Sequence, residues 1–389
     1  MKNKFLLLLS AGHIATDLNQ GALPAILPFL VAAGGLSYAN AAGLSFAVAM
    51  ASSLVQPLFG IWSDKFNMRW LIPIGTLMAG LFMSLLGPLH EHYWLMFAVA
   101  VLSGIGVAAF HPEAARMANQ LAGKKKGGGM SIFSVGGSLG FAMGPAIVTA
   151  VMLYAGLSGS LVLAFPALAM FTLLRLKSSP MRDAAVLSLE REKAASPALA
   201  AGKNEWGMFW WLTVAIIFRS IIFHNINTFL PLYWVNVLGQ SMASGGVIPT
   251  IMFIAGAVGV LLGGQLADRV GLNAITRISA VLVIPALFIF TRVTNPVLAV
   301  ICVVLMSLLK AMANTPMIIL GQKFLSGNMG FASGVTLGLS VSVGGMVAPL
   351  VGRYADIHGL LAAFQLLAFL PLVPAIVTLT LKRPVVDRE

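Results

Sequence analysis

The sequence predicts an all-α membrane protein with twelve transmembrane helices, arranged as two six-helix halves related by pseudo-twofold symmetry. Composition gives the first reason: 59% of the 389 residues are hydrophobic and only 9% are charged, whereas a soluble domain carries roughly 25% charge. The apolar runs are also continuous, as in residues 281–290, and lack the period-two alternation of a transmembrane β-barrel. A soluble protein and a β-barrel are both excluded.

Each predicted span is an apolar run of about 20 residues, the length that crosses a hydrocarbon core of about 30 Å. Charged residues, glycines and prolines separate the runs. The first run follows a basic start without a small-residue cleavage site, so we interpret it as a retained helix. The predicted spans are residues 5–31, 39–62, 70–89, 93–118, 128–153, 157–174, 206–235, 245–267, 275–291, 296–321, 330–353 and 358–381.

Membrane topology explains the net charge of +12. If the N-terminus is cytoplasmic, 20 of the 24 lysines and arginines fall in cytoplasmic segments, as the positive-inside rule requires. The exceptions are Arg292 and Arg353 on the outer side, and Arg219 and Lys310 inside spans. We therefore predict a multi-pass protein of the inner or plasma membrane, with both termini cytoplasmic, no nucleic-acid partner and a monomeric state.

A polar segment rich in Ala and Ser, residues 175–205, lies between the sixth and seventh spans. It predicts a cytoplasmic linker between an N-terminal bundle, residues 1–174, and a C-terminal bundle, residues 206–389. Within the linker, residues 181–194 fit either an amphipathic helix on the membrane surface or a solvated tether.

An internal repeat supports the division into halves. Residues 60–65 recur at 264–269, an offset of 204, and Pro112 recurs at the same offset as Pro316. The glycine and proline pattern of residues 140–145 recurs at 344–349. Three matches at one offset indicate a duplicated six-helix unit, which is the architecture of one large class of secondary transporters.

These motifs resemble those of the major facilitator superfamily, over the whole chain. The loop with Gly60, Asp64, Lys65 and Arg69 is similar to its signature loop, and Gly140, Gly144 and Pro145 are similar to its antiporter motif. More narrowly, the chain resembles the fosmidomycin resistance protein family, in the segments Gly12-His13-x-x-x-Asp17, Ser63–Phe66, Pro73–Gly75, Phe110–Arg116 and Ser131–Gly137.

The resemblance implies a proton-coupled antiporter that exports a small anionic drug by alternating access, such as a phosphonate antibiotic of the fosmidomycin or fosfomycin type. Antibiotic resistance by drug efflux follows from it. The signature loop is expected to control conformation, with Asp64 paired to a cation such as Arg116. Gly140, Gly144 and Pro145 are expected to provide close helix packing and a bend.

Polar residues inside the spans are the candidates for the transport chemistry, because buried charge in a membrane is costly. His13, Asp17 and Gln20 share one face of the first span at i, i+4, i+7 spacing. Asp17 fits either a proton carrier or a structural hydrogen bond. Glu113 fits either a local ion pair with Arg116 or a proton site beside His111 at the helix bend next to Pro112. The candidates for proton coupling are Asp17, His13, Glu113 and His111.

Two cations lie near the midplane of the other half, Arg219 in the seventh span and Lys310 in the tenth. Neither span contains an Asp or Glu, so the partner of each cation is either Asp17 or an anionic substrate. Asn314 shares a face with Lys310. We predict Arg219, Lys310, Asn314, Gln20, His224 and Asn227 as substrate-binding residues, although His224 and Asn227 also fit a packing role.

Three other functions were compared with drug export. A proton- or anion-coupled transporter of an anionic metabolite, such as an organophosphate or a carboxylate, would use the same cations. An enzyme is not expected, because the spans show no His/Glu cluster with ligand spacing and Cys302 lacks an acid-base partner. A channel is disfavoured, because the sequence shows no pattern that resembles a selectivity filter of backbone carbonyls or a ring of charged side chains. We predict protons as the coupling ion, and no cofactor or metal.

Overall fold

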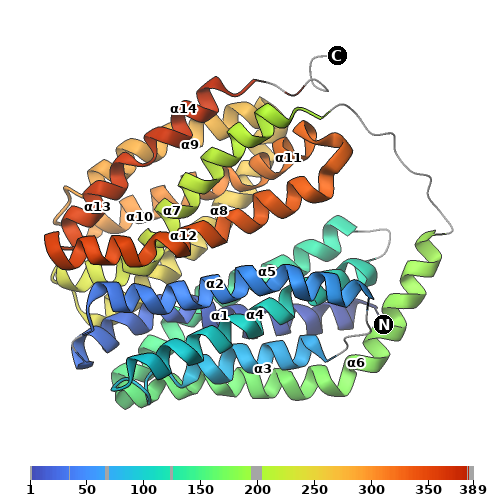
Figure 1. The fold of residues 1–389 in the computed structure, drawn as a ribbon, viewed down its shortest axis with the longest axis horizontal. Coiled ribbons are helices and arrows are strands. Elements are labelled where there is room, and N and C mark those ends of the chain that lie inside the picture. Colours follow the sequence, from blue (N-terminus) through green and yellow to red (C-terminus); the bar gives the residue numbers. More distant parts are fainter. Residues whose placement is uncertain are drawn as a thin grey trace. The chain divides into compact units, whose positions relative to one another are not determined.

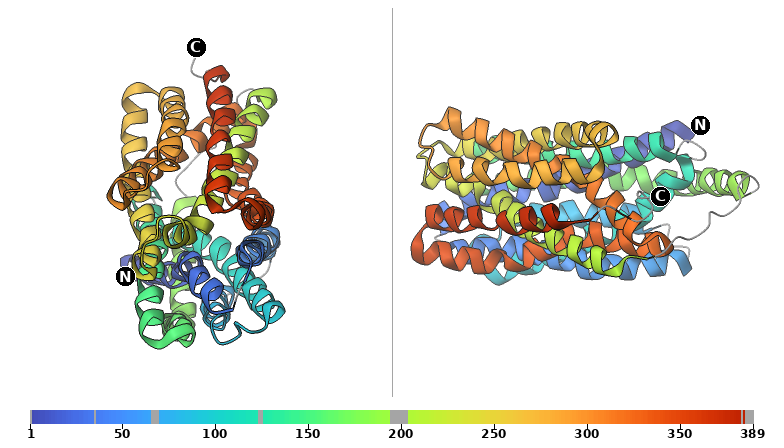
Figure 2. Two further views of the ribbon diagram at one scale, coloured as in Figure 1. Left: turned by 90° about the vertical axis from the view of Figure 1, so that its left-hand side faces the viewer. Right: turned by 90° about the horizontal axis from the view of Figure 1, so that it is seen from above.

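The computed structural model describes residues 2–34, 36–65, 70–122, 126–193, 204–382 and 384. All regular secondary structure in this part of the chain is helical (Figures 1 and 2). The helices are α1 (Lys2–Gly34), α2 (Tyr38–Lys65), α3 (Leu71–Ser84), α4 (Tyr93–Ala122), α5 (Lys126–Ala155), η1 (Gly156–Leu163), α6 (Ala164–Lys193), α7 (Trp206–Asn236), α8 (Met242–Val270), α9 (Leu272–Phe290), α10 (Pro296–Met312), α11 (Asn314–Phe324), η2 (Ser326–Asn328), α12 (Met329–His358), α13 (Leu360–Phe369) and α14 (Leu372–Thr380).

The chain forms two compact units. The first unit comprises residues 1–36 and 43–198, and therefore holds α1, most of α2, and α3 to α6. The second comprises residues 37–42 and 199–389, and holds α7 to α14. Each has a hydrophobic core of its own, which contains Phe110 in the first unit and Phe209 in the second.

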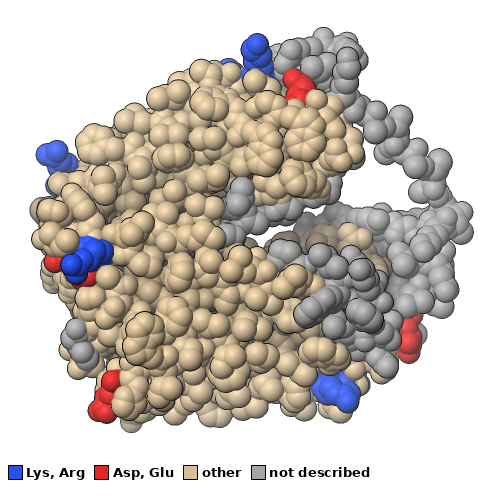
Figure 3. All heavy atoms as spheres, viewed as in Figure 1, with Lys and Arg blue, Asp and Glu red and all other residues tan. Residues whose placement is uncertain are grey.

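The helices are suited to a lipid environment. Nine helical segments of the described chain are long and apolar enough to cross a membrane. Large apolar side chains also point outward: Phe165, Leu261 and Leu350 are 71%, 67% and 71% exposed. On the face drawn in Figure 3, the described charged side chains lie near the edges, with uncharged surface between them. Hydrocarbon, not water, is the solvent that such a surface fits.

Two predicted spans are divided in the structure. The tenth breaks at Ala313 into α10 and α11, and the twelfth breaks near Pro371 into α13 and α14. Pro316 explains the first break, because proline lacks the N–H that would continue the helical hydrogen bonds. Apolar periodicity carries through both breaks, so it predicts one span where the backbone forms two helices.

The sixth span differs in length. α6 continues to Lys193, so the first part of the segment predicted as a linker is helical and continuous with the span. Residues 181–193 are thus helical as a continuation of the sixth span, and an amphipathic helix on the membrane surface stays a prediction. Residues 194–203 lie outside the described part of the chain.

Glycines bring α1 and α5 into backbone contact. A Cβ added at Gly140 would lie 2.5 Å from the carbonyl oxygen of Ile14, and one added at Gly144 would lie 2.8 Å from the amide nitrogen of Ala22. Side chains cannot occupy that space without separating the helices. The corresponding Gly344 packs α12 against α7, so the two units use the same kind of helix pair.

Candidate functional site

Three titratable side chains meet inside the first unit. Asp17 lies between two imidazoles: its Oδ2 is 3.1 Å from Nε2 of His13, and its Oδ1 is 3.1 Å from Nε2 of His111. Gln20 donates a further hydrogen bond from Nε2 to Oδ1, at 3.2 Å. His13 and Asp17 are buried, with 8% and 3% of their surface exposed. Both carboxylate oxygens therefore have nitrogen neighbours in a site that largely excludes water.

Three helices hold this cluster. His13 and Asp17 are four residues apart on α1 and share a face. Nδ1 of His13 lies 2.8 Å from the carbonyl oxygen of Phe133 on α5. The Phe133 ring stacks on His13, with 4.2 Å between centroids. On α4, Nδ1 of His111 lies 3.0 Å from the Val107 carbonyl oxygen. Each ring is thus fixed on both of its nitrogens.

The cluster corrects one expectation from the sequence, which found no group with metal-ligand spacing. The ligand atoms of His13, Asp17 and His111 lie within 4.8 Å of one another, close enough to share one bound cation. Spacing along the chain could not show this, because His111 is contributed by a different helix from the other two residues. That no metal occupies the site stays a prediction.

Glu113 lies in α4 near the cluster but has a partner of its own. Its carboxylate accepts hydrogen bonds from Arg116, with Nε–Oε2 and Nη2–Oε1 distances of 2.9 and 2.6 Å. Glu113 is buried and Arg116 is partly exposed. The structure thus shows the local ion pair, whereas Nε2 of His111 contacts Asp17.

In the second unit, Arg219 of α7 binds to the break between α10 and α11. Its Nη2 donates to the carbonyl oxygen of Lys310 at 2.8 Å and to Oδ1 of Asn314 at 2.9 Å. Arg219 is buried, with 8% of its surface exposed. One end of the guanidinium therefore fastens a discontinuous helix of the kind that forms transporter binding sites.

Lys310 projects from the same break without an acidic partner in its own helices. Its Nζ lies 5.4 Å from the ring centroid of Phe223, within the range of a cation–π interaction. Arg219, which donates to the Lys310 carbonyl oxygen, adds a second positive charge nearby. Residues 206–236 and 296–324 contain no Asp or Glu. Positive charge in this region is therefore not neutralised by the helices that carry it.

Two predicted binding residues of α7 have an unpaired polar atom. Among the described residues, the buried atoms without a hydrogen-bond partner include Nε2 of His224 and Oδ1 of Asn227. Buried polar atoms are normally paired, so each of these two atoms can make a further hydrogen bond. Arg219, Lys310, Asn314, His224 and Asn227 thus come from two neighbouring spans, whereas Gln20 belongs to the Asp17 cluster in the other unit.

The predicted conformational residues are only partly described. Arg69 lies outside the described residues, as do the surroundings of Gly60 and the side chains of Asp64 and Lys65 at the end of α2. The pairing of Asp64 with a cation such as Arg116 stays a prediction. Gly140, Gly144 and Pro145 lie in α5, where the two glycines contact α1.

Sequence reasoning missed three residues that contact the predicted site residues. Phe133 supplies a carbonyl oxygen and a stacked ring to His13, and Phe223 lies beside Lys310. At Gly137, an added Cβ would lie 2.6 Å from Nε2 of His13. The segment Ser131–Gly137 had been noted for its resemblance to a family motif, and that was the one available signal for Phe133 and Gly137.

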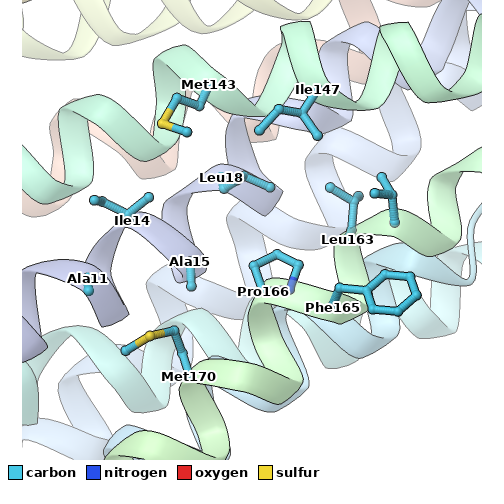
Figure 4. Close-up of a pocket in the computed structure, with 11 residues that line it drawn as sticks. Ala11, Ile14, Ala15, Leu18, Met143, Ile147, Leu163, Phe165, Pro166 and Met170 are labelled. Carbon is cyan, nitrogen blue, oxygen red and sulfur yellow. The ribbon is translucent and has the colours of Figure 1, made fainter.

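An apolar cavity of about 440 Å³ lies on the other side of α1. Ile14 and Leu18 of α1, Met143 and Ile147 of α5, and Phe165 of α6 line it (Figure 4). Its lining offers no group that could recognise a charge. The cavity opens among exposed side chains such as Met143 and Phe165, so it belongs to the lipid-facing surface and not to the polar site.

Known relatives resemble the chain over most of its length. It is 26% identical over 370 residues to the fosmidomycin resistance protein of Escherichia coli (strain K12), covering 94% of this chain and 89% of that protein. It is 27% identical over 373 residues to the MFS-type transporter YfnC of Bacillus subtilis (strain 168), covering 95% and 90%. A shorter match, 23% identical over 254 residues, is to a probable L-galactonate transporter of Escherichia coli (strain K12), covering 60% and 54%.

Solved structures of transporters share the fold. A D-xylose–proton symporter superposes with a TM-score of 0.77 at 15% identity, covering 97% of each chain. The nucleoside transporter NupG superposes with a TM-score of 0.72 at 16% identity, covering 97% of this chain and 98% of that one. The family profile of the Major Facilitator Superfamily matches residues 9–349. The predicted fold is confirmed: this chain belongs to the major facilitator superfamily, as a membrane transporter and not an enzyme.

Proposed function

We propose that this transporter is a proton-coupled antiporter that exports a small anion of the phosphonate class. The observation that carries the proposal is the pair of cations in the second unit, the buried Arg219 and the partly buried Lys310, which lie in helices without an acidic residue. A buried charge at this depth requires a partner. An anionic substrate supplies one, and the unpaired Nε2 of His224 offers a further hydrogen bond.

The chemistry of the two cations suits a phosphonate. Nη2 of Arg219 is committed to Lys310 and Asn314, which leaves Nη1 and Nε free to donate single hydrogen bonds to phosphonate oxygens. The Lys310 ammonium acts as a point charge beside it. The 26% identical fosmidomycin resistance protein supports the substrate class, since fosmidomycin is a phosphonate.

The proposed direction and coupling agree with electrostatics. With the cell interior negative, moving one negative charge outward releases about 2.3 kcal/mol per 100 mV. Proton entry adds to this driving force. The His13–Asp17–His111 cluster is the proposed proton site, because it places three titratable groups in mutual contact in a buried position. Protons are thus the proposed coupling ion, and the plasma membrane the proposed location.

Lys310→Gln tests the cationic site, because glutamine retains much of the length and removes the charge. Fosfomycin binding to the purified protein should weaken about 10- to 100-fold, the effect of losing one hydrogen bond to a charged group. Arg219→Lys should weaken it similarly, since an ammonium cannot reproduce the fixed planar set of donors of the guanidinium. Lys382→Gln is the matched control at an exposed position. Unchanged binding in both site variants would sink the cationic-site proposal.

Export and coupling require a flux measurement. Proteoliposomes that contain the protein should accumulate labelled fosfomycin when a pH gradient is imposed in the direction of antiport. Accumulation that ignores the gradient would exclude proton coupling.

A second candidate substrate is an anionic metabolite that carries a carboxylate. The match to a probable L-galactonate transporter favours it, because galactonate bears a carboxylate that the same cations could bind. A competition assay distinguishes the two substrates. If galactonate displaces labelled fosfomycin at a concentration equal to or lower than that of unlabelled fosfomycin, the carboxylate is the better substrate.

A further inference from the structure

We infer that the cluster of His13, Asp17 and His111 binds two protons, one on each side of the carboxylate. The inference rests on the proposed proton coupling, and it adds a stoichiometry and an atomic position for each proton. Four contacts carry it: the two between imidazole and carboxylate, and the two between imidazole and backbone.

The backbone contacts determine which nitrogen of each ring carries hydrogen. Nδ1 of His13 lies 2.8 Å from the Phe133 carbonyl oxygen, and Nδ1 of His111 lies 3.0 Å from the Val107 carbonyl oxygen. A carbonyl oxygen can only accept a hydrogen bond. Both Nδ1 atoms must therefore donate, so each ring has a hydrogen on Nδ1 whatever its charge.

The opposite nitrogens then face Asp17. In a neutral ring with its hydrogen on Nδ1, the Nε2 atom has a lone pair and no hydrogen. Each Nε2 lies 3.1 Å from a different carboxylate oxygen. A lone pair against a carboxylate oxygen at this distance is repulsive, whereas a proton between the two atoms makes a charge-assisted hydrogen bond. The geometry thus provides one proton position on each side of Asp17.

The two protons change the net charge of the cluster by two units. With both protons present, two imidazolium rings and one carboxylate carry a net charge of +1. With both protons released, two neutral rings and one carboxylate carry −1. Gln20 donates to Oδ1 in either state, so it supports the carboxylate without taking part in the titration. Releasing both protons also removes both attractive contacts of Asp17, of which the one with His111 joins α1 to α4.

The surrounding helices supply no other proton carrier in contact with the cluster. From the sequence, the parts of α2, α3, α5, η1 and α6 within residues 43–63, 71–84, 127–153, 156–163 and 164–174 contain no titratable side chain. On α4, the neighbouring titratable groups are Glu113 and Arg116, which form the ion pair described above. The two protons are therefore assigned to His13, Asp17 and His111 themselves.

The proton number can be measured in proteoliposomes. The fosfomycin gradient at which net flux stops is determined for several imposed pH gradients at a fixed membrane potential, and the slope gives protons per fosfomycin. We expect two for the wild type. His13→Gln and His111→Gln should each give one, because the amide nitrogen donates a hydrogen bond to Asp17 but cannot take up a proton. His92→Gln, at an exposed position, should leave the value at two.

The outcomes separate this inference from the proposed function. A wild-type value of one that neither His13→Gln nor His111→Gln changes would overturn the two-proton assignment and leave coupling intact. A wild-type value of zero would overturn the proposed coupling itself. Transport that a chelator abolishes and Zn²⁺ restores would identify a metal in place of the protons. Fosfomycin exchange without a gradient shows that each variant folds.

A second measurement needs no substrate. In protein labelled with ¹⁵N-histidine, the nitrogen shifts distinguish the imidazolium from each neutral tautomer, and the two glutamine variants assign the signals. As pH rises and the protons leave, both rings should become the neutral form with hydrogen on Nδ1. A neutral ring with hydrogen on Nε2, at either position, would contradict the argument from the backbone carbonyls.

Discussion

Asp17 connects the polar side chains of the cluster in the first unit. Its two oxygens contact nitrogens from His13, Gln20 and His111, which come from two helices. Removing its charge should therefore have a larger effect than removing either imidazole. The buried ion pair of Glu113 with Arg116 is a separate interaction, so the two acids can be tested independently.

We expect Asp17→Asn to reduce gradient-driven fosfomycin efflux at least about tenfold, corresponding to about 1.4 kcal/mol. Exchange of fosfomycin across the membrane should be retained in part, because a neutral amide resembles the protonated carboxyl and exchange requires no proton cycling. Both rates are measured in the same proteoliposomes. If Asp17→Asn keeps full gradient-driven efflux, Asp17 is structural and Glu113 becomes the main candidate for the proton carrier.

At the scale of helices, adjacent glycines in α8 face different surroundings. A Cβ added at Gly263 would lie 2.5 Å from the Cα atom of Met312 in α10, whereas one added at Gly264 would meet no atom within 4 Å. The close approach of α8 and α10 therefore depends on Gly263. Gly264, the repeat counterpart of Gly60, makes no such contact in the described structure.

Gly263→Ala should lower the free energy of unfolding by about 1–3 kcal/mol, because the helices must separate to admit the methyl group. Gly264→Ala is the matched control and should raise it by up to about 1 kcal/mol, since alanine restricts the unfolded chain. Cys302, buried in α10, reports the transition by reacting with a maleimide dye on heating. Equal midpoints for the two variants would show that α8 and α10 do not pack this closely.

Elements were more predictable from the sequence than contacts. The need for about 20 apolar residues per crossing makes each span visible, whereas the break at Ala313 depends on Pro316 within an uninterrupted apolar run. Helical spacing placed His13 beside Asp17. The position of His111 next to both follows from the packing of α1 and α4, which no single-helix pattern contains. For the same reason, the Phe133 carbonyl oxygen could not be foreseen.

For the whole molecule, the distribution of Lys and Arg predicts an orientation that labelling can test. In a Cys302→Ser background, Ser241→Cys should react with an impermeant maleimide applied to intact cells, because residues 236–244 are predicted to face outward. Lys382→Cys should react only after the membrane is permeabilised. Both positions are exposed, so reactivity reports sidedness and not burial. The reverse pattern would overturn the predicted topology.

The two halves of the repeat carry different polar groups. In the first half Gln20 supports a carboxylate, whereas the helices of Arg219 and Lys310 in the second half contain no acidic residue. In a symmetric dimer of separate six-helix chains, every substitution would appear twice, and a cation gained for one copy would also be imposed on the other. Fusion of the copies into one gene removes that constraint. Each half could then specialise, one in a carboxylate between two imidazoles and the other in an arginine with a lysine.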